Sequence, residues 1–210
     1  MDQGLELANG SCMPWAELSN LFVELNQATG FNLLVVLSAC YAGHFLSRLL
    51  TFEPAPFWMM LAPTETIDPA EILRGFRKFY SELISSRDIG KAMQSLSSVA
   101  LEEGHWFAQN AEQWFERMTA DYVKNHCNVR VARARVNSNY AKLKAEGHQM
   151  PMKEVKRHFK KANKDALLGT HFDKYFMTSA IPRNAFRFQL TKRRLTVKLE
   201  AMRSTGQYWI

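Results

Sequence analysis

The sequence predicts an α/β domain over residues 1–100, followed by a mostly helical, basic region over residues 101–210. Two mainly apolar runs without alternation, 31–39 and 57–62, are typical of strands that are buried on both faces of a parallel sheet. These runs alternate with segments of helical periodicity, which is the element order of doubly wound folds. From about residue 101, aromatic and basic residues at helical spacing replace this pattern.

In the first region, the expected helices have recognisable starts and stops. Residues 1–10 have the pattern of a short hairpin. Pro14 suits the first turn of a helix that Gly30 ends. Asp68 and Asp88 are both suited to cap helices, and apolar side chains follow each of them at helical spacing.

In the second region, the sequence predicts three helices and one strand. Aromatic residues over 107–122 mark a long helix, and residues 131–146 form a basic amphipathic one. A second basic helix covers 152–168, and Gly169 is expected to end it. Apolar residues alternate over 186–190, which is the pattern of a strand.

Composition excludes several protein classes. Of the 210 residues, 47% are hydrophobic and 22% are charged, which is typical of folded soluble proteins. The mainly apolar run 33–39 is shorter than the roughly 20 residues that cross a bilayer, and residues 1–10 do not resemble a secretory signal. The three cysteines have no disulfide spacing. We therefore expect a cytoplasmic protein with no membrane association and no cofactor.

Charge is divided unevenly between the two halves. Residues 1–119 hold 7 basic and 14 acidic side chains, a net charge of −7, whereas residues 120–210 hold 20 and 6, a net charge of +14. Such asymmetry predicts two regions with different partners. The alternative is that they are two faces of one molecule that partly neutralise each other.

Cys40 is the sharpest candidate for chemistry. It lies in the segment 38–43 (SACYAG), directly after the first buried run, and doubly wound folds place their ligands at the carboxyl ends of parallel strands. A short helix is expected over 44–50, and a helix N-terminus lowers the pKa of a nearby thiol. Gly43 allows a substrate to approach the backbone. The alternative role for Cys40 is that of a small buried hydrophobic residue.

The segment 35–43 (VVLSACYAG) resembles the nucleophile strand of caspase-like cysteine peptidases, a group that includes caspases, metacaspases and CHAT-type domains. Segments 6–22 and 56–84 resemble neighbouring elements of CHAT-type sequences, so the resemblance covers about residues 1–100. It implies a partial caspase-like doubly wound sheet and a peptide or protein substrate. It also implies that Cys40 attacks a peptide carbonyl while its backbone N–H contributes to the oxyanion hole.

One part of the family pattern is missing. The partner histidine of caspases precedes the nucleophile by about 50 residues, and none of the 39 residues before Cys40 is a histidine. We therefore expect a peptidase homologue that is incomplete or inactive unless the base comes from elsewhere. His44, four residues after Cys40, is a weak substitute. No metal site is expected, because no His or Cys spacing supports one.

Glu65 follows the second buried run and is therefore expected at the same sheet edge as Cys40. Its carboxylate is a candidate for binding a basic side chain of a substrate. A solvated or capping loop carboxylate is the alternative that we favour.

Clustered basic residues in the second region predict binding to nucleic acid or to an acidic protein partner. The candidates are Lys156, Arg157, Lys160, Lys161, Lys164, Lys192, Arg193 and Arg194. Nearby aromatic residues, among them Tyr140, Phe159, Phe172, Tyr175 and Phe176, are candidates for stacking on bases. We favour the alternative that these rings lie in a core beneath a solvated cationic face, because no helix-turn-helix, RRM or zinc-finger pattern occurs.

The first buried run also needs a strand on each side. In the caspase-like family the strand that bears the histidine pairs beside it, and an exposed apolar edge invites pairing with another chain. We therefore expect a homodimer, a fold in which a C-terminal segment such as 186–190 covers that edge, or aggregation.

Overall fold

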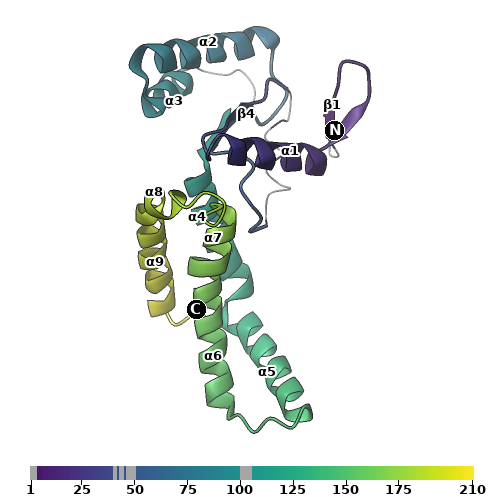
Figure 1. The fold of residues 1–210 in the computed structure, drawn as a ribbon, viewed down its shortest axis with the longest axis vertical. Coiled ribbons are helices and arrows are strands. Elements are labelled where there is room, and N and C mark those ends of the chain that lie inside the picture. The colour runs from purple at the N-terminus through teal and green to yellow at the C-terminus, as the bar shows by residue number, and fades with distance from the viewer. Residues whose placement is uncertain (1–3, 40–41, 43–44, 46–50, 100–105) are drawn as a thin grey trace. The chain divides into compact units, whose positions relative to one another are not determined.

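The computed structural model describes residues 4–39, 42, 45, 51–99 and 106–210. These residues form an α/β fold followed by a mostly helical region, which confirms the coarse prediction. The chain divides into two compact units: unit 1 contains residues 1–50 and 56–111, and unit 2 contains residues 51–55 and 112–210 (Figure 1). Unit 1 therefore extends past the boundary expected near residue 100.

Unit 1 begins with the expected hairpin and helix. Strand β1 (Gly4–Glu6) pairs antiparallel with β2 (Cys12–Pro14). Helix α1 (Trp15–Ala28) follows directly, and the chain leaves it through Gly30, whose φ of 65° is easily adopted by glycine.

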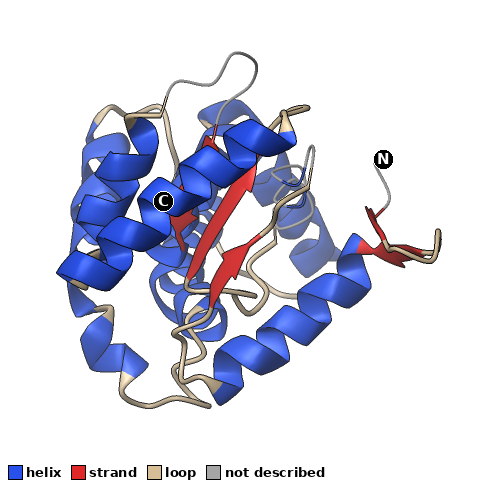
Figure 2. Cartoon of the chain, turned by 90° about the horizontal axis from the view of Figure 1, so that it is seen from above, coloured by secondary structure: helices blue, strands red, loops and turns tan. Residues whose placement is uncertain are grey.

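A three-stranded sheet lies at the centre of unit 1 (Figure 2). Strand β3 (Leu34–Val36) pairs in parallel with β4 (Met59–Pro63), as the two apolar runs predict. All five residues of β4 are buried. Strand β5 (Trp106–Asn110) pairs with β4 on the other side and runs antiparallel to it.

Strand β5 corrects the prediction of a long aromatic helix over 107–122. The backbone of residues 106–110 pairs with β4 along its whole length, from Met59 opposite Asn110 to Pro63 opposite Trp106. This tertiary pairing overrides a helical spacing of aromatic residues, because local preferences are weaker than sheet pairing and burial. Helix α4 (Ala111–His126) begins only after the strand.

Two helices pack on one face of this sheet. Helices α2 (Pro69–Ser86) and α3 (Ile89–Ser97) begin at the predicted caps: Asp68 accepts a hydrogen bond from the N–H of Ala70, and Asp88 accepts bonds from Gly90 and Lys91. Their apolar sides form a core cluster with the sheet. Its buried members are Leu61, Phe79, Ala92 and Leu96.

Strand β3 lies at one edge of the sheet, and no second strand among the described residues pairs with it. The prediction that segment 186–190 covers this edge as a strand is wrong, because that segment is helical. Pairing with a second copy stays a prediction, as does the finer doubly wound arrangement.

Unit 2 is built from helices (Figure 1). After α4, helices α5 (Val129–Ala145) and α6 (Met152–Asp165) run antiparallel as a hairpin. Gly147, with a φ of 85°, ends α5 as expected. The predicted stop at Gly169 is wrong. The chain continues from α6 through a π-helical turn, η2 (Ala166–Thr170), into α7 (His171–Tyr175), because a glycine weakens a helix without breaking it.

The strand expected over 186–190 is also wrong. Helix α8 (Asn184–Arg187) leads into α9 (Gln189–Ser204). The N–H groups of Phe188 and Lys192 donate to carbonyls four residues earlier, at 3.0 Å each, so helical bonds lie on both sides of the junction, and Phe188, with a φ of −99° and a ψ of 16°, separates the two helices. An alternation over five residues is too short to distinguish a strand from a helix with one buried side.

An aromatic core joins α4, α7 and the strap of residues 51–55. The ring of Phe115 lies 5.6 Å from that of Phe172 and 5.3 Å from that of Phe176. Phe52 of the strap stacks on His171 at 4.5 Å. Burial, followed by the nearby Lys174, lowers the pKa of His171.

No helix among the described residues has the length and apolar character needed to cross a membrane.

The contact between α2 and β5 yields the first prediction. A Cβ at Gly75 would lie 2.6 Å from Cζ2 of Trp106. Replacing a helical glycine by alanine normally stabilises a helix by about 1 kcal/mol. We expect Gly75→Ala to lower the free energy of unfolding instead, by about 1–3 kcal/mol, because the ring must shift. Urea unfolding followed by circular dichroism measures this change.

Gly169→Ala is the matched control, since no atom lies within 4 Å of the added carbon there. We expect this variant to be neutral or more stable. Equal stabilisation by both substitutions would contradict the packing of Trp106 against Gly75.

Candidate functional site

Most of the candidate peptidase residues cannot be placed. Cys40, Gly43 and His44 lie outside the described residues. Glu65 is exposed and follows the last residue of β4 by two positions. Because β3 and β4 are parallel, their carboxyl ends share one sheet edge, and Glu65 follows β4 at that edge. The catalytic roles of Cys40 and His44 stay predictions.

The basic residues of α6 gather on one side of the helix. At about 100° per residue, they occupy an arc of about 140° on the side away from the buried Val155. We call this surface the α6 cationic face. It consists of Lys153, Lys156, Arg157, Lys160, Lys161 and Lys164. A hollow of about 430 Å³ is lined by its first four members together with Glu154.

The ring of Trp209 contacts two lysine side chains of this face. The Nζ atom of Lys156 lies 4.0 Å from the centre of its indole ring, and that of Lys160 lies 5.5 Å away. An aromatic face attracts cations through its quadrupole, so the ring holds both ammonium groups near one point. The backbone of Trp209 is fixed in turn, because its N–H donates to the carbonyl of Cys127 at 2.8 Å and its carbonyl accepts from Asn163 Nδ2 at 3.1 Å.

Like charges are crowded here. Burial lowers the pKa of Lys160, and the neighbouring charges of Lys156 and Arg203 lower it further. Lys164 forms an ion pair with Glu200 at 3.3 Å. Across the described part of the chain, no carboxylate pairs with Lys156, Arg157, Lys160 or Lys161. Six cations of the face therefore stand against two nearby carboxylates, Glu154 in the lining of the hollow and Glu200 beside Lys164, and a bound anion would relieve the remaining repulsion.

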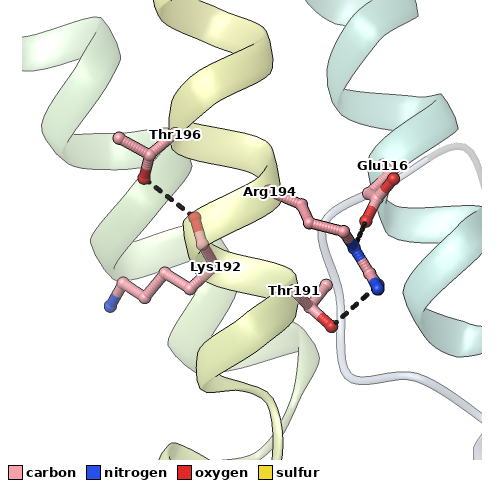
Figure 3. Close-up of polar contacts among 5 residues, drawn as sticks. All are labelled: Glu116, Thr191, Lys192, Arg194 and Thr196. Atoms are coloured by element: carbon pink, nitrogen blue, oxygen red, sulfur yellow. Dashed lines mark hydrogen bonds and ion pairs between the residues drawn. The ribbon is translucent and has the colours of Figure 1, made fainter.

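The second predicted cluster is not a single surface. Lys192, Arg193 and Arg194 are consecutive on α9 and therefore point in different directions. Arg194 donates to Glu116 of α4 at 3.0 Å and to Thr191 at 3.3 Å (Figure 3). The ammonium group of Lys192 lies 3.9 Å from Asp173. Two of these three cations thus have carboxylate partners within unit 2.

The expected stacking rings lie inside the protein or beneath cations. Phe172, Tyr175 and Phe176 are buried in the core of unit 2. Tyr140 and Phe159 are half-buried against the α5–α6 core, and the guanidinium of Arg135 lies 5.0 Å from the centre of the Phe159 ring. These rings are therefore not positioned to stack on bases, in agreement with the alternative that we favoured.

The sequence reasoning missed Arg203 and Trp209. Both lie near the end of the printed chain, more than 35 residues from α6, and no local pattern connects them to that helix. The sequence gives one signal for Trp209: it is a large aromatic residue in a polar, Gly-containing segment, and such a residue usually packs against another part of the protein.

The described residues hold no assembled catalytic or metal centre. Cys127 is buried, and desolvation raises the pKa of its thiol to about 11, so it stays protonated near neutral pH. No group of three His, Cys, Asp or Glu side chains within 4–39, 51–99 and 106–210 is arranged to hold a metal ion. What these residues do provide is a positive surface suited to bind phosphate oxygens.

Comparison with known proteins identifies no relative: the chain matches no family model, no curated protein and no solved structure. The resemblance to caspase-like peptidases therefore stays a prediction.

Proposed function

We propose that unit 2 binds the phosphate backbone of nucleic acid through the α6 cationic face. The observation that carries this proposal is the placement of Lys156 and Lys160 over the Trp209 ring, with the charge of Arg203 acting on Lys160 and no ion pair to either lysine among the described residues. Lysine and arginine clusters gain affinity by releasing the counterions that are condensed on phosphates. Binding of phosphates would also reduce the electrostatic repulsion among the cations of this face.

Recognition through this face is independent of base sequence. Base readout needs side chains that reach into a groove or rings on which bases stack. The rings near α6 are covered by the cations of Lys156, Lys160 and Arg135. The remaining contacts are to phosphates, which are the same along any sequence.

The proposal predicts a specific loss of affinity. In the triple variant Lys156→Gln, Arg157→Gln, Lys160→Gln, we expect the affinity for a random-sequence DNA duplex to fall on the order of 100-fold at 0.1 M salt, because about three phosphate contacts are lost. Fluorescence anisotropy with a labelled duplex measures this loss.

A matched control removes three exposed cations from α2 and α3, as Arg77→Gln, Lys78→Gln, Lys91→Gln. This variant has the same net charge as the first. We expect its affinity to stay within about threefold of the native value, allowing for long-range charge effects. An equal loss in both variants would show that net charge, rather than the α6 cationic face, determines binding.

We propose a second function for unit 1, that of a caspase-like cysteine peptidase homologue with Cys40 as its nucleophile. The parallel pairing of β3 and β4 supports it, because Cys40 and Glu65 each follow one of these strands in the sequence. Ligand sites of α/β folds form at such an edge.

This second function predicts that Cys40 is the most reactive thiol. With limiting iodoacetamide at neutral pH, we expect Cys40 to be modified before Cys12, since a thiol activated by its surroundings reacts faster than one that is merely exposed. Cys127 is the internal negative control, because its pKa of about 11 and its burial protect it. Peptide mapping by mass spectrometry gives the order of modification. Earlier labelling of Cys12 would rule out an activated Cys40.

A further inference from the structure

Helices α8 and α9 expose three large apolar side chains in a row. Phe186 is 83% exposed, and Leu190 and Val197 are each 67% exposed. Among the described residues, only Ile84 on α2 is similarly exposed for a large apolar side chain. Isolated exposed apolar residues are ordinary, whereas an aligned group indicates an interaction surface.

Leu190 and Val197 share one face of α9, because they stand seven positions apart on that helix. A spacing of seven returns to within about 20° of the same direction. Phe186 lies on α8, four positions before Leu190, and Phe188, with a φ of −99° and a ψ of 16°, separates the two helices. The opposite side of α9 is buried in unit 2 through Leu195 and Leu199. We call the exposed row the α9 seam: Phe186, Leu190 and Val197.

The dimensions of the α9 seam fit one helix. On α9 the seam runs about 10 Å from Leu190 to Val197, at 1.5 Å per residue, and is one side chain wide, with Phe186 of α8 preceding it. Leu190 and Val197 are one heptad apart, as are apolar residues in the narrow contact between paired helices. Helices that lie on a membrane surface bury a much wider apolar face than this.

The charges beside the α9 seam indicate which kind of partner helix it can bind. Arg193 lies on one side of the seam and Lys198 on the other, both exposed, and neither pairs with a carboxylate in the described part of the chain. Arg194, on the Lys198 side, already binds Glu116 from the neighbouring α4 (Figure 3). Glu200 lies on the Arg193 side of the seam, but it already pairs with Lys164 at 3.3 Å. A second α9 would bring like charges together along the Lys198 side, so pairing with another copy through this seam is unfavourable.

We propose that the α9 seam binds an acidic amphipathic helix of a partner protein. Apolar side chains of the partner would cover Phe186, Leu190 and Val197, and its flanking carboxylates would pair with Arg193 and Lys198. This site is separate in its residues from the α6 cationic face, so it does not rest on the proposed binding of nucleic acid.

The test uses the full chain and a labelled synthetic peptide of three heptads, with Ile and Leu at its apolar positions and Glu at the flanking positions. Two control peptides carry Lys at the flanking positions, or Ser at the apolar positions. We expect only the first peptide to bind. The double variant Leu190→Ser, Val197→Ser should weaken its binding at least about tenfold, because both apolar contacts are lost. Arg193→Ser, Lys198→Ser should weaken it by a similar factor.

Ile84→Ser is the matched control, since it removes an equally exposed apolar side chain from unit 1. We expect this variant to bind the peptide like the native chain, and circular dichroism confirms that each variant is folded. The proposal is overturned if no peptide binds, if the Lys or Ser peptides bind equally well, or if the seam variants bind unchanged. It is also overturned if Leu190→Ser, Val197→Ser instead abolishes binding to phosphatidylserine vesicles or to a DNA duplex while leaving peptide binding intact.

Discussion

Trp209 packs against both α5 and α6, two helices whose span of residues 129–165 carries eleven basic and three acidic side chains. Such a hairpin opposes its own formation, because like charges repel along its length. The apolar cluster of Ala132, Val136, Val155 and Trp209 provides the opposing attraction. Backbone bonds reinforce it: Val129 donates to the carbonyl of Gln207 at 3.0 Å, and Trp209 donates to that of Cys127 at 2.8 Å. Residues 205–210 therefore hold the hairpin closed, and the same indole ring positions the cations of the α6 cationic face.

The two units are stabilised by different means. In unit 1 the central strand β4 is entirely buried, and the sheet is held by apolar packing beneath α2 and α3. Unit 2 has an aromatic core around Phe115 and Phe176, but its outer surfaces carry an excess of positive charge and the α9 seam. Surfaces of these kinds are unfavourable for a helical unit in isolation, and each becomes favourable when a complementary partner covers it. Phosphate and an acidic helix are the partners proposed for these two surfaces of unit 2.

The sequence predicts the helices and strands that depend on local signals. It fails to predict those that depend on contacts between distant segments. The caps at Asp68 and Asp88, the stop at Gly30 and the parallel pair β3–β4 follow from short-range patterns and burial, and the structure has them. The aromatic spacing predicts a helix over residues 107–110, because pairing with β4, more than 40 residues earlier, is invisible in local spacing. The alternation over 186–190 misled for a related reason: burial of Phe188 between exposed Phe186 and Leu190 fits either a strand or a helix side. The basic residues of α6 were predicted, whereas the support that Trp209 gives them depends on tertiary contact.

The central claim is that a fixed set of cations on α6 neutralises phosphates, and the dependence of duplex affinity on salt tests it most directly. The logarithm of the association constant falls linearly with the logarithm of salt concentration, with a slope of about −0.9 for each phosphate contact. The account predicts that the slope for the native chain is steeper than that for Lys156→Gln, Arg157→Gln, Lys160→Gln by about 2.7, which corresponds to about three contacts. Equal slopes for the two proteins would contradict it, because the phosphates would then be neutralised elsewhere on the chain.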